Sequence, residues 1–151
     1  MATDFSEHSE RALNQAAYLA KRVGAELYLV HVFKRPVYIP GVSSRAGPKI
    51  LEWIHGFKER VRKRLVALGK EIGRKGVKVH PILKEGAPLR EILKTADEIS
   101  ADLIVLGAPG RTGLDRFMLG SVAERLARRA PCPVLIARPI SLSVEGKRKA
   151  A

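Results

Sequence analysis

The sequence predicts an α/β fold in a single domain with a parallel sheet. Amphipathic helical segments alternate along the chain with short apolar runs, and such an order builds right-handed βαβ units. Residues 103–106 form an unbroken apolar run, as in a strand that is covered on both faces. With 151 residues, of which 46% are hydrophobic, the chain is long enough to bury one sizeable core.

The first helix is expected to begin at Asp4 or Ser6, because either side chain can cap it and acidic residues follow in the first turn. Apolar residues keep helical spacing as far as residue 23, and Gly24 is a typical stop. Residues 25–33 are mostly apolar and partly β-branched, which predicts a strand.

Residues 34–48 are rich in proline and glycine, which predicts a long loop of the kind that often covers a ligand. Apolar residues then recur at steps of three and four over residues 50–72, which predicts an amphipathic helix of about seven turns. A short strand is expected over residues 77–83. Pro88 is well placed as the first residue of a third helix that extends to residue 99.

The buried strand at residues 103–106 is followed by a glycine-rich loop and by a helix over residues 121–129. A Pro-Cys-Pro sequence ends this helix, and residues 134–137 are expected to form a last strand at an edge of the sheet. The predicted domain covers residues 1–138. The basic tail, residues 139–151, is expected to be disordered.

The bulk composition narrows the classes of partner and compartment. A formal net charge of +13 favours anionic partners, which include nucleotides, nucleic acids and anionic lipids. No apolar run has the length of a membrane span, and no signal peptide is evident. Cys132 is the single cysteine, so an internal disulfide is excluded and a reducing, cytoplasmic location is expected.

The stretch that carries the functional signal has the pattern Gly107, two residues, Gly110, nine residues, Gly120 and Ser121. Glycines let a phosphate approach the backbone, and the N–H groups and dipole of a helix N-terminus favour an anion. Two purely structural roles fit the same residues: an ordinary tight turn at the first two glycines, and a capping box formed by Ser121 and Glu124.

This G-x2-G-x9-G-[ST] pattern resembles the nucleotide-binding signature of the universal stress protein family. Segments 3–13, 120–124 and 130–135 are also similar to the family, and the resemblance covers nearly the whole of residues 2–138. It implies an adenine nucleotide alpha hydrolase-like, three-layer sandwich with a five-stranded parallel sheet in the order 3-2-1-4-5. It also implies a homodimer joined along the last strand, and binding of ATP or AMP with Mg²⁺.

The resemblance implies which residues contact each part of the nucleotide. Those expected to border the adenine are Ala2, Thr3 and Val32. Asp4 is expected near the ribose or a phosphate-bound Mg²⁺. The residues that would make room for ribose and phosphates, or hold the phosphates, are Gly107, Gly110, Arg111, Gly120, Ser121 and Val122. Ala108 and Pro109 depart from the family pattern, and the proline removes one N–H donor.

Several of these residues can also serve an ordinary structural purpose. Asp4 can be a helix cap, Arg111 a solvated loop residue and Val32 a core strand residue. The four histidines show no metal-ligand spacing, and His31 is read as a core histidine with satisfied hydrogen bonds. Cys132 has no base near it in the sequence and is read as structural.

The start of the chain departs from the family plan. In the family, an apolar strand in the middle of the sheet leads into a turn like that of residues 3–6, whereas here only Met1 and Ala2 precede the turn. Without that strand its neighbours would have unpaired backbone groups. We expect either that the sequence is truncated by a few residues, or that another segment or another chain fills the place.

The function that these features predict is ATP binding in a regulatory or stress-response role. No dedicated general base is evident, so any ATP hydrolysis is expected to be slow. One alternative is a nucleotide-free dimeric interaction module. The other is a nucleic-acid-binding protein that uses the basic segment 58–75 and the tail, although aromatic residues make up 5% of the chain and do not interleave with these charges.

Overall fold

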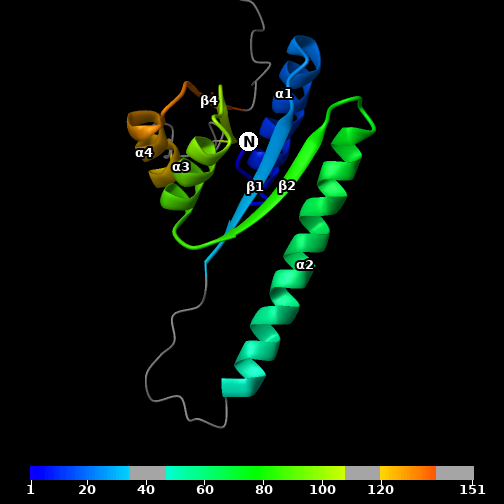
Figure 1. Ribbon diagram of the computed structural model, residues 1–151, viewed down its shortest axis with the longest axis vertical. Helices are drawn as coiled ribbons and strands as arrows, with labels where there is room; N and C mark the ends of the chain where they lie inside the picture. The colour runs from blue at the N-terminus through cyan, green and yellow to red at the C-terminus, as the bar shows by residue number, and fades with distance from the viewer. Residues whose placement is uncertain (35–46, 108–119, 139–151) are drawn as a thin grey trace, which may run out of the picture.

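The computed structural model describes residues 1–34, 47–107 and 120–138 (Figure 1). Helices and strands alternate along them, as the sequence predicts. The helices are α1 (Glu7–Val23), α2 (Gly47–Gly73), α3 (Pro88–Glu98) and α4 (Ser121–Arg129). The strands are β1 (Leu27–Phe33), β2 (Val79–Glu85), β3 (Ile104–Gly107) and β4 (Val134–Ala137). Most of the expected loop at residues 34–48, and the whole tail at residues 139–151, lie outside the described residues.

The strands form two parallel pairs, β1 with β2 and β3 with β4. Leu27 lies opposite Val79 in the first pair, and Ile104 lies opposite Val134 in the second. The structure therefore shows two short sheets where the sequence predicted one sheet of five strands, and the order 3-2-1-4-5 stays a prediction.

The first three residues of the chain connect the two sheets. The Ala2 N–H donates to the Val105 carbonyl at 3.0 Å, on β3. On the other side, the Thr3 N–H donates to the Val30 carbonyl and the Val30 N–H donates to the Met1 carbonyl, both at 2.9 Å, on β1. This short extended segment thus lies between β1 and β3, where the resemblance places the first strand.

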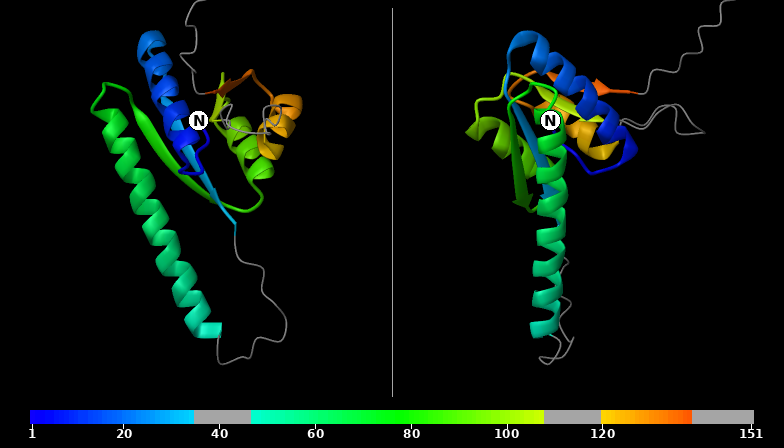
Figure 2. Two further views of the ribbon diagram at one scale, coloured as in Figure 1. Left: turned by 180° about the vertical axis from the view of Figure 1, so that it is seen from behind. Right: turned by 90° about the vertical axis from the view of Figure 1, so that its right-hand side faces the viewer.

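The fold has three layers, with α1 and α2 on one face of the strands and α3 and α4 on the other (Figure 2). The side chains of β3 show the two faces, because successive side chains of a strand point to opposite faces of the sheet. Val105 packs in the cluster that contains α1 residues, whereas Ile104 and Leu106 pack in the cluster that contains α3 and α4 residues.

The ends of α1 follow from its sequence. Ser6 is the N-cap and its hydroxyl accepts a hydrogen bond from the Ser9 N–H at 3.2 Å, so the cap is Ser6 and not Asp4. At the other end Gly24 adopts φ of 70°, the left-handed conformation that glycine tolerates best. Both ends of this helix are therefore determined locally.

The longest helix, α2, packs against β2 and β1 along its second half, and its amino-terminal half extends well beyond the strands (Figure 1). In this half Trp53 is 56% exposed and stacks on Phe57. Within the described parts of the chain, no helix has the length and apolar character that crossing a membrane requires.

The amino group of Met1 lies inside the protein, between the two sheets. Met1 is 8% exposed, and its amino group donates a hydrogen bond to the Tyr28 carbonyl at 2.9 Å. Burial disfavours the charged form and lowers the pKa of this amino group from 8.0 to about 6.

We expect the buried amino group to make stability depend on pH. Between pH 8 and pH 6 the unfolded chain binds a proton that the folded protein does not, so the folded state loses stability as the pH falls through this range. The loss is about 2–3 kcal/mol, from about 1.4 kcal/mol per pKa unit. Urea unfolding at pH 8.5 and pH 5.5 measures it, with Nα-acetylated protein as the control. Equal pH dependence of the two proteins would contradict the prediction.

Candidate functional site

A cavity of about 200 Å³ lies near the carboxyl ends of β1 and β3, beside the N-termini of α1 and α4. In open α/β sheets this edge is the usual place for a ligand. The residues that line the cavity are Ala2, Thr3, Asp4, Ser9, Val30, His31, Val32, Pro88, Ile92, Leu106, Gly107, Val122 and Ala123.

The structure brings most of the predicted site residues to this cavity. Those that line it directly are Ala2, Thr3, Asp4, Val32, Gly107 and Val122. Gly120 and Ser121 directly precede Val122 at the start of α4. Gly110 and Arg111 lie outside the described residues, so their place relative to the cavity is a prediction.

The turn that precedes α1 is held by its own side chains. The buried Thr3 hydroxyl lies 3.0 Å from the Ser9 hydroxyl and accepts a hydrogen bond from the Phe5 N–H at 3.1 Å. Phe5 has φ of 63°, a conformation that is uncommon for residues other than glycine. The Ser6 N–H donates to Asp4 Oδ1 at 2.9 Å. These contacts hold Asp4 in a defined position at the mouth of the cavity.

The Asp4 carboxyl is ionised more readily than usual. Partial burial alone raises its pKa, but hydrogen bonds from Ser6 and Ser9 together outweigh burial and hold the pKa below its usual range. A carboxylate only accepts hydrogen bonds, so Asp4 can bind hydroxyl groups directly and can approach a phosphate only through a cation. In residues 1–34, 47–107 and 120–138, no three His, Cys, Asp or Glu residues form a metal-binding group.

His31 lines the cavity, although the sequence indicated only a core position. Its Nδ1 lies 2.8 Å from the Thr3 carbonyl oxygen. A carbonyl only accepts, so Nδ1 carries the proton and Nε2 is an acceptor in the neutral ring. The Phe5 ring lies 4.4 Å from the His31 ring, and the Arg64 guanidinium lies over Phe5 at 4.5 Å. Only tertiary structure brings His31 to residue 3, so no local sequence signal marks it.

Helix α4 begins after a glycine, which has no side chain to serve as a cap. Gly120 is the N-cap residue, with φ of 83° and ψ of 138°, and no side chain caps it within the described residues. The capping box that the sequence allowed does not form, because the N-cap is Gly120 and not Ser121. The Glu124 carboxylate pairs with Arg128 at 3.1 Å instead. Among the described residues, no side chain accepts from the first N–H groups of α4, and a phosphate suits such donors.

Gly107 has a structural role that the sequence did not indicate. A Cβ atom at this position would lie 2.5 Å from the His8 carbonyl oxygen and 2.8 Å from the Ser9 nitrogen. Both are backbone atoms of the first turn of α1, which cannot move aside as a side chain can. The glycine thus lets α1 pack closely against the end of β3, and it also borders the cavity.

Together these features define an α/β domain of parallel strands with a crevice at their carboxyl ends, next to an uncapped helix N-terminus. Comparison with known proteins agrees, since the sequence model of the universal stress protein family matches residues 1–138. The chain belongs to this family.

Two relatives and one solved structure illustrate the similarity. The universal stress protein MJ0531 of Methanocaldococcus jannaschii is 37% identical over 90% of this chain and 78% of its own length. YxiE of Bacillus subtilis is 37% identical over 91% of this chain and 96% of its own length. A crystal structure of a family protein from Burkholderia pseudomallei has a TM-score of 0.70 and 34% identity, and covers 90% of this chain and 91% of that chain.

Two other similar structures hold adenine nucleotides. A universal stress protein from Archaeoglobus fulgidus in complex with dAMP has a TM-score of 0.57 and 26% identity, over 89% of this chain and 92% of that chain. A universal stress protein in complex with cAMP has a TM-score of 0.59 and 27% identity, over 91% of this chain and 93% of that chain.

Proposed function

We propose that this protein binds ATP in the crevice at the carboxyl ends of β1 and β3, and that it acts as a regulatory protein rather than as a dedicated enzyme. The observation that carries the proposal is the uncapped N-terminus of α4, whose second and third residues line the crevice opposite the Thr3–Asp4 turn. Such a terminus supplies N–H donors and a favourable dipole for phosphate. Complexes of similar proteins with dAMP and cAMP support an adenine nucleotide as the ligand.

Each part of the nucleotide has a proposed position. The adenine lies against Ala2, Thr3 and Val32, which are mostly apolar and close to the backbone of two strands. The Asp4 carboxylate either holds Mg²⁺ on the phosphates or accepts hydrogen bonds from the ribose hydroxyls, and the Asp4→Asn experiment below distinguishes the two roles. The phosphates lie at the start of α4, with donors from Gly120, Ser121 and Val122, and from the Gly110–Arg111 loop.

We also propose the arrangement of the domain and its assembly. The proposed domain comprises residues 1–138. Its five strands lie in the order β2, β1, Met1–Thr3, β3, β4, which is the expected order 3-2-1-4-5 when Met1–Thr3 is counted as the first strand. Since β4 ends its sheet, a homodimer can form along this strand in the cytoplasm. Hydrolysis of ATP is expected to be slow.

The first test identifies the ligand. Protein that is purified without added nucleotide is denatured, and the supernatant is analysed by mass spectrometry. ATP and AMP are then titrated into the nucleotide-free protein by calorimetry, with and without Mg²⁺. Saturable, stoichiometric binding of ATP supports the proposal. Preference for AMP changes the ligand, and absence of heat with every nucleotide overturns the proposal in favour of a nucleotide-free interaction module.

A substitution at Asp4 tests the proposed role of Mg²⁺. Asp4→Asn keeps an oxygen that can accept from the Ser6 N–H, so the turn should be preserved. If the carboxylate holds Mg²⁺ on the phosphates, the variant binds MgATP about tenfold more weakly, since one lost charged contact is worth about 1.4 kcal/mol. Without Mg²⁺, the variant should bind ATP at least as tightly as the wild type, because a negative charge has been removed.

The matched control for this experiment is Asp97→Asn, an exposed aspartate on α3 that does not line the crevice. It should leave ATP affinity unchanged in both conditions. Equal losses for Asp4→Asn with and without Mg²⁺ would contradict the metal role and would leave Asp4 as a ribose-binding residue.

The structure does not favour the nucleic-acid alternative. Two basic residues of the α2 segment have acidic partners on other elements, Lys58 with Glu85 and Arg64 with Glu10. Paired cations are less available to a phosphate backbone. Binding to single-stranded DNA that weakens steeply with salt, in protein that binds no nucleotide, would reverse this ranking.

A further inference from the structure

Phe5, the residue that follows Asp4, has a backbone conformation that its side chain disfavours. Its φ is 63°, in the left-handed region, where a bulky residue is strained. Strain of this kind persists only where the surrounding structure holds the residue in place, and it is concentrated at ligand sites. The contacts of Phe5 therefore show what holds the turn in its shape.

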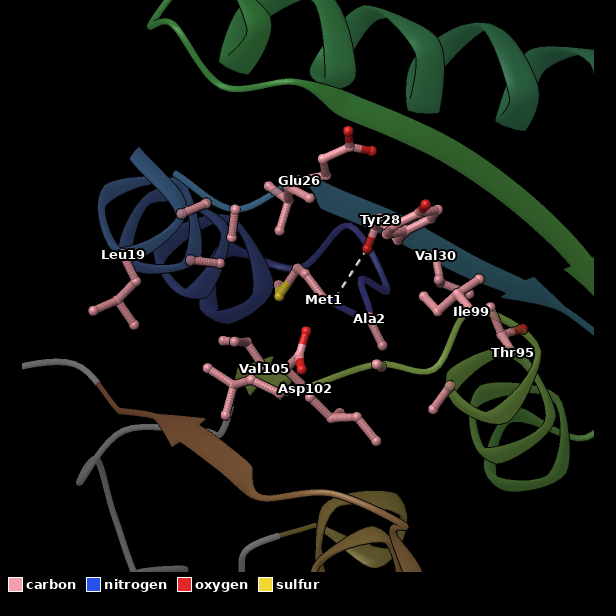
Figure 3. A pocket seen from close by; sticks show the side chains of 18 of the residues that line it. Met1, Ala2, Leu19, Glu26, Tyr28, Val30, Thr95, Ile99, Asp102 and Val105 are labelled. Atoms are coloured by element: carbon pink, nitrogen blue, oxygen red, sulfur yellow. Dashed lines mark hydrogen bonds between the residues drawn. The ribbon is translucent and has the colours of Figure 1, made fainter. Parts of the chain in front are cut away.

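The chain is fixed on both sides of this turn. Before the turn, the N–H groups of residues 2 and 3 donate to the carbonyls of Val105 on β3 and Val30 on β1, so this segment lies between the two strands (Figure 3). After the turn, Ser6 is the N-cap of α1. The path of the chain from the strands to the helix depends on the two residues that lie between.

The conformation of Phe5 determines the direction of the next N–H group. The Ser6 N–H donates to Asp4 Oδ1 at 2.9 Å, and the Phe5 N–H donates to the Thr3 hydroxyl at 3.1 Å. Rotation of Phe5 to a negative φ would turn the peptide group between Phe5 and Ser6, and the first of these hydrogen bonds would break. The Asp4 carboxylate would then lose its defined position at the crevice.

The Phe5 ring contacts side chains from two other elements. The His31 ring of β1 lies 4.4 Å from it, and His31 Nδ1 lies 2.8 Å from the Thr3 carbonyl oxygen of the same turn. The Arg64 guanidinium of α2 lies over the Phe5 ring, 4.5 Å from its centroid, as a cation–π contact. These contacts favour the rotamer and the backbone conformation that Phe5 has.

Arg64 also contacts the backbone of the turn. Its Nη2 donates to the Phe5 carbonyl at 3.4 Å and lies 3.5 Å from Glu10 Oε1 on α1. The Phe5 carbonyl and the Ser6 N–H belong to one peptide group, so the directions of the two change together. The Arg64 side chain is 54% exposed, so its removal leaves the core packed.

We propose that Arg64 is a positioning residue for nucleotide binding, because it holds Phe5 in the left-handed conformation and so keeps the Asp4 carboxylate in place at the crevice. The inference rests on the proposed function, since it concerns the affinity of that site. A ligand that requires one conformation of the turn binds more weakly in proportion to the fraction of protein that has it. None of the described residues of α2 lines the crevice, so this arginine gives α2 an indirect effect on binding.

The main test compares Arg64→Ala with Arg62→Ala by calorimetry with MgATP. Both variants lose one exposed arginine of α2, so any general attraction between the basic protein and ATP falls equally in both. Arg62 has its carboxylate partner, Glu59, on the same helix at 3.8 Å. Arg64→Ala should bind about threefold more weakly or worse, which corresponds to a turn that is formed in about a third of the molecules. Arg62→Ala should bind as the wild type does.

Phe5→Gly separates positioning from a direct contact between Arg64 and the nucleotide. Glycine adopts a positive φ without steric cost, so the turn no longer depends on a side chain that holds residue 5. Arg64→Ala should therefore lower the affinity by less than about twofold when it is added to Phe5→Gly. The same loss from Arg64→Ala in both backgrounds would overturn the proposal and would indicate a direct contact.

NMR spectra of the nucleotide-free protein test the turn without any ligand. In Arg64→Ala the Ser6 amide should shift and exchange faster with solvent, because its hydrogen bond to Asp4 is broken in part of the molecules. Amides of β3 and α4 should keep their positions, which excludes general unfolding. A Ser6 amide that is unchanged in Arg64→Ala contradicts the proposal, even if the ATP affinity falls. A wild-type protein that binds no nucleotide refutes the proposed function instead, and a shifted Ser6 amide then still supports the hold of Arg64 on the turn.

Discussion

Replacing Gly107 by alanine is expected to destabilise the protein by about 3 kcal/mol or more. The new Cβ atom would lie 2.5 Å from the His8 carbonyl oxygen, far inside van der Waals contact. Overpacking of this kind costs about 1–3 kcal/mol where neighbours can adjust, and more where they cannot. Here the neighbours are the backbone atoms of α1, so the helix must shift away from β3.

Urea unfolding followed by circular dichroism measures this effect. The matched control is Gly56→Ala in α2, where a Cβ atom would make only an ordinary contact, 3.6 Å from the Arg60 side chain. Alanine is the better helix former, so this control should be neutral or stabilising by about 0.5–1 kcal/mol. Similar unfolding midpoints for the two variants would show that α1 and β3 do not pack as closely as the structure has them.

The second large effect is expected on nucleotide binding. Gly120→Val should weaken ATP binding at least thirtyfold, or about 2 kcal/mol, while the protein stays folded. Gly120 has φ of 83°, which a β-branched residue adopts only with strain, but a Cβ atom there would meet none of the described residues within 4 Å. The backbone must therefore rotate, and the N–H groups at the start of α4 then point away from the crevice.

Calorimetry with ATP measures the loss, and Gly24→Val is the matched control. Gly24 also has a positive φ, of 70°, and a Cβ atom there would likewise be clear of every described residue by 4 Å, but this residue ends α1 away from the crevice. The control should lose stability and keep its ATP affinity. Equal ATP affinity in Gly120→Val and the wild type would exclude the start of α4 as the phosphate site.

The element boundaries that depend on local chemistry could be predicted well. Ser6 caps α1 and Gly24 ends it, and Pro88 is the first residue of α3, as their residue types require. Strand boundaries were less accurate. The predicted strand at residues 77–83 is β2, Val79–Glu85, because its partner β1 begins only at Leu27 and pairing determines where a strand begins.

The candidate site was predicted partly through resemblance, and the structure gives several of its residues a different role. Gly107 is needed where α1 contacts β3, a contact that no spacing along the chain reveals. The Ser121–Glu124 capping box does not form, since the helix begins one residue earlier than the box requires, with Gly120 as the N-cap. His31 lies at the crevice because its Nδ1 bonds to the Thr3 carbonyl oxygen, and these two residues are 28 positions apart in the sequence.

The sequence alone predicted the α/β class, the end of α1, the start of α3 and the resemblance to the family, because each depends on neighbouring residues or on motifs read along the chain. It could not establish which backbone groups meet across the fold. Met1–Thr3 lies between Val30 and Val105, and this arrangement forms one wall of the crevice at the carboxyl ends of β1 and β3. Such contacts join segments that are distant in sequence, and they form only when the helices pack on both faces of the strands.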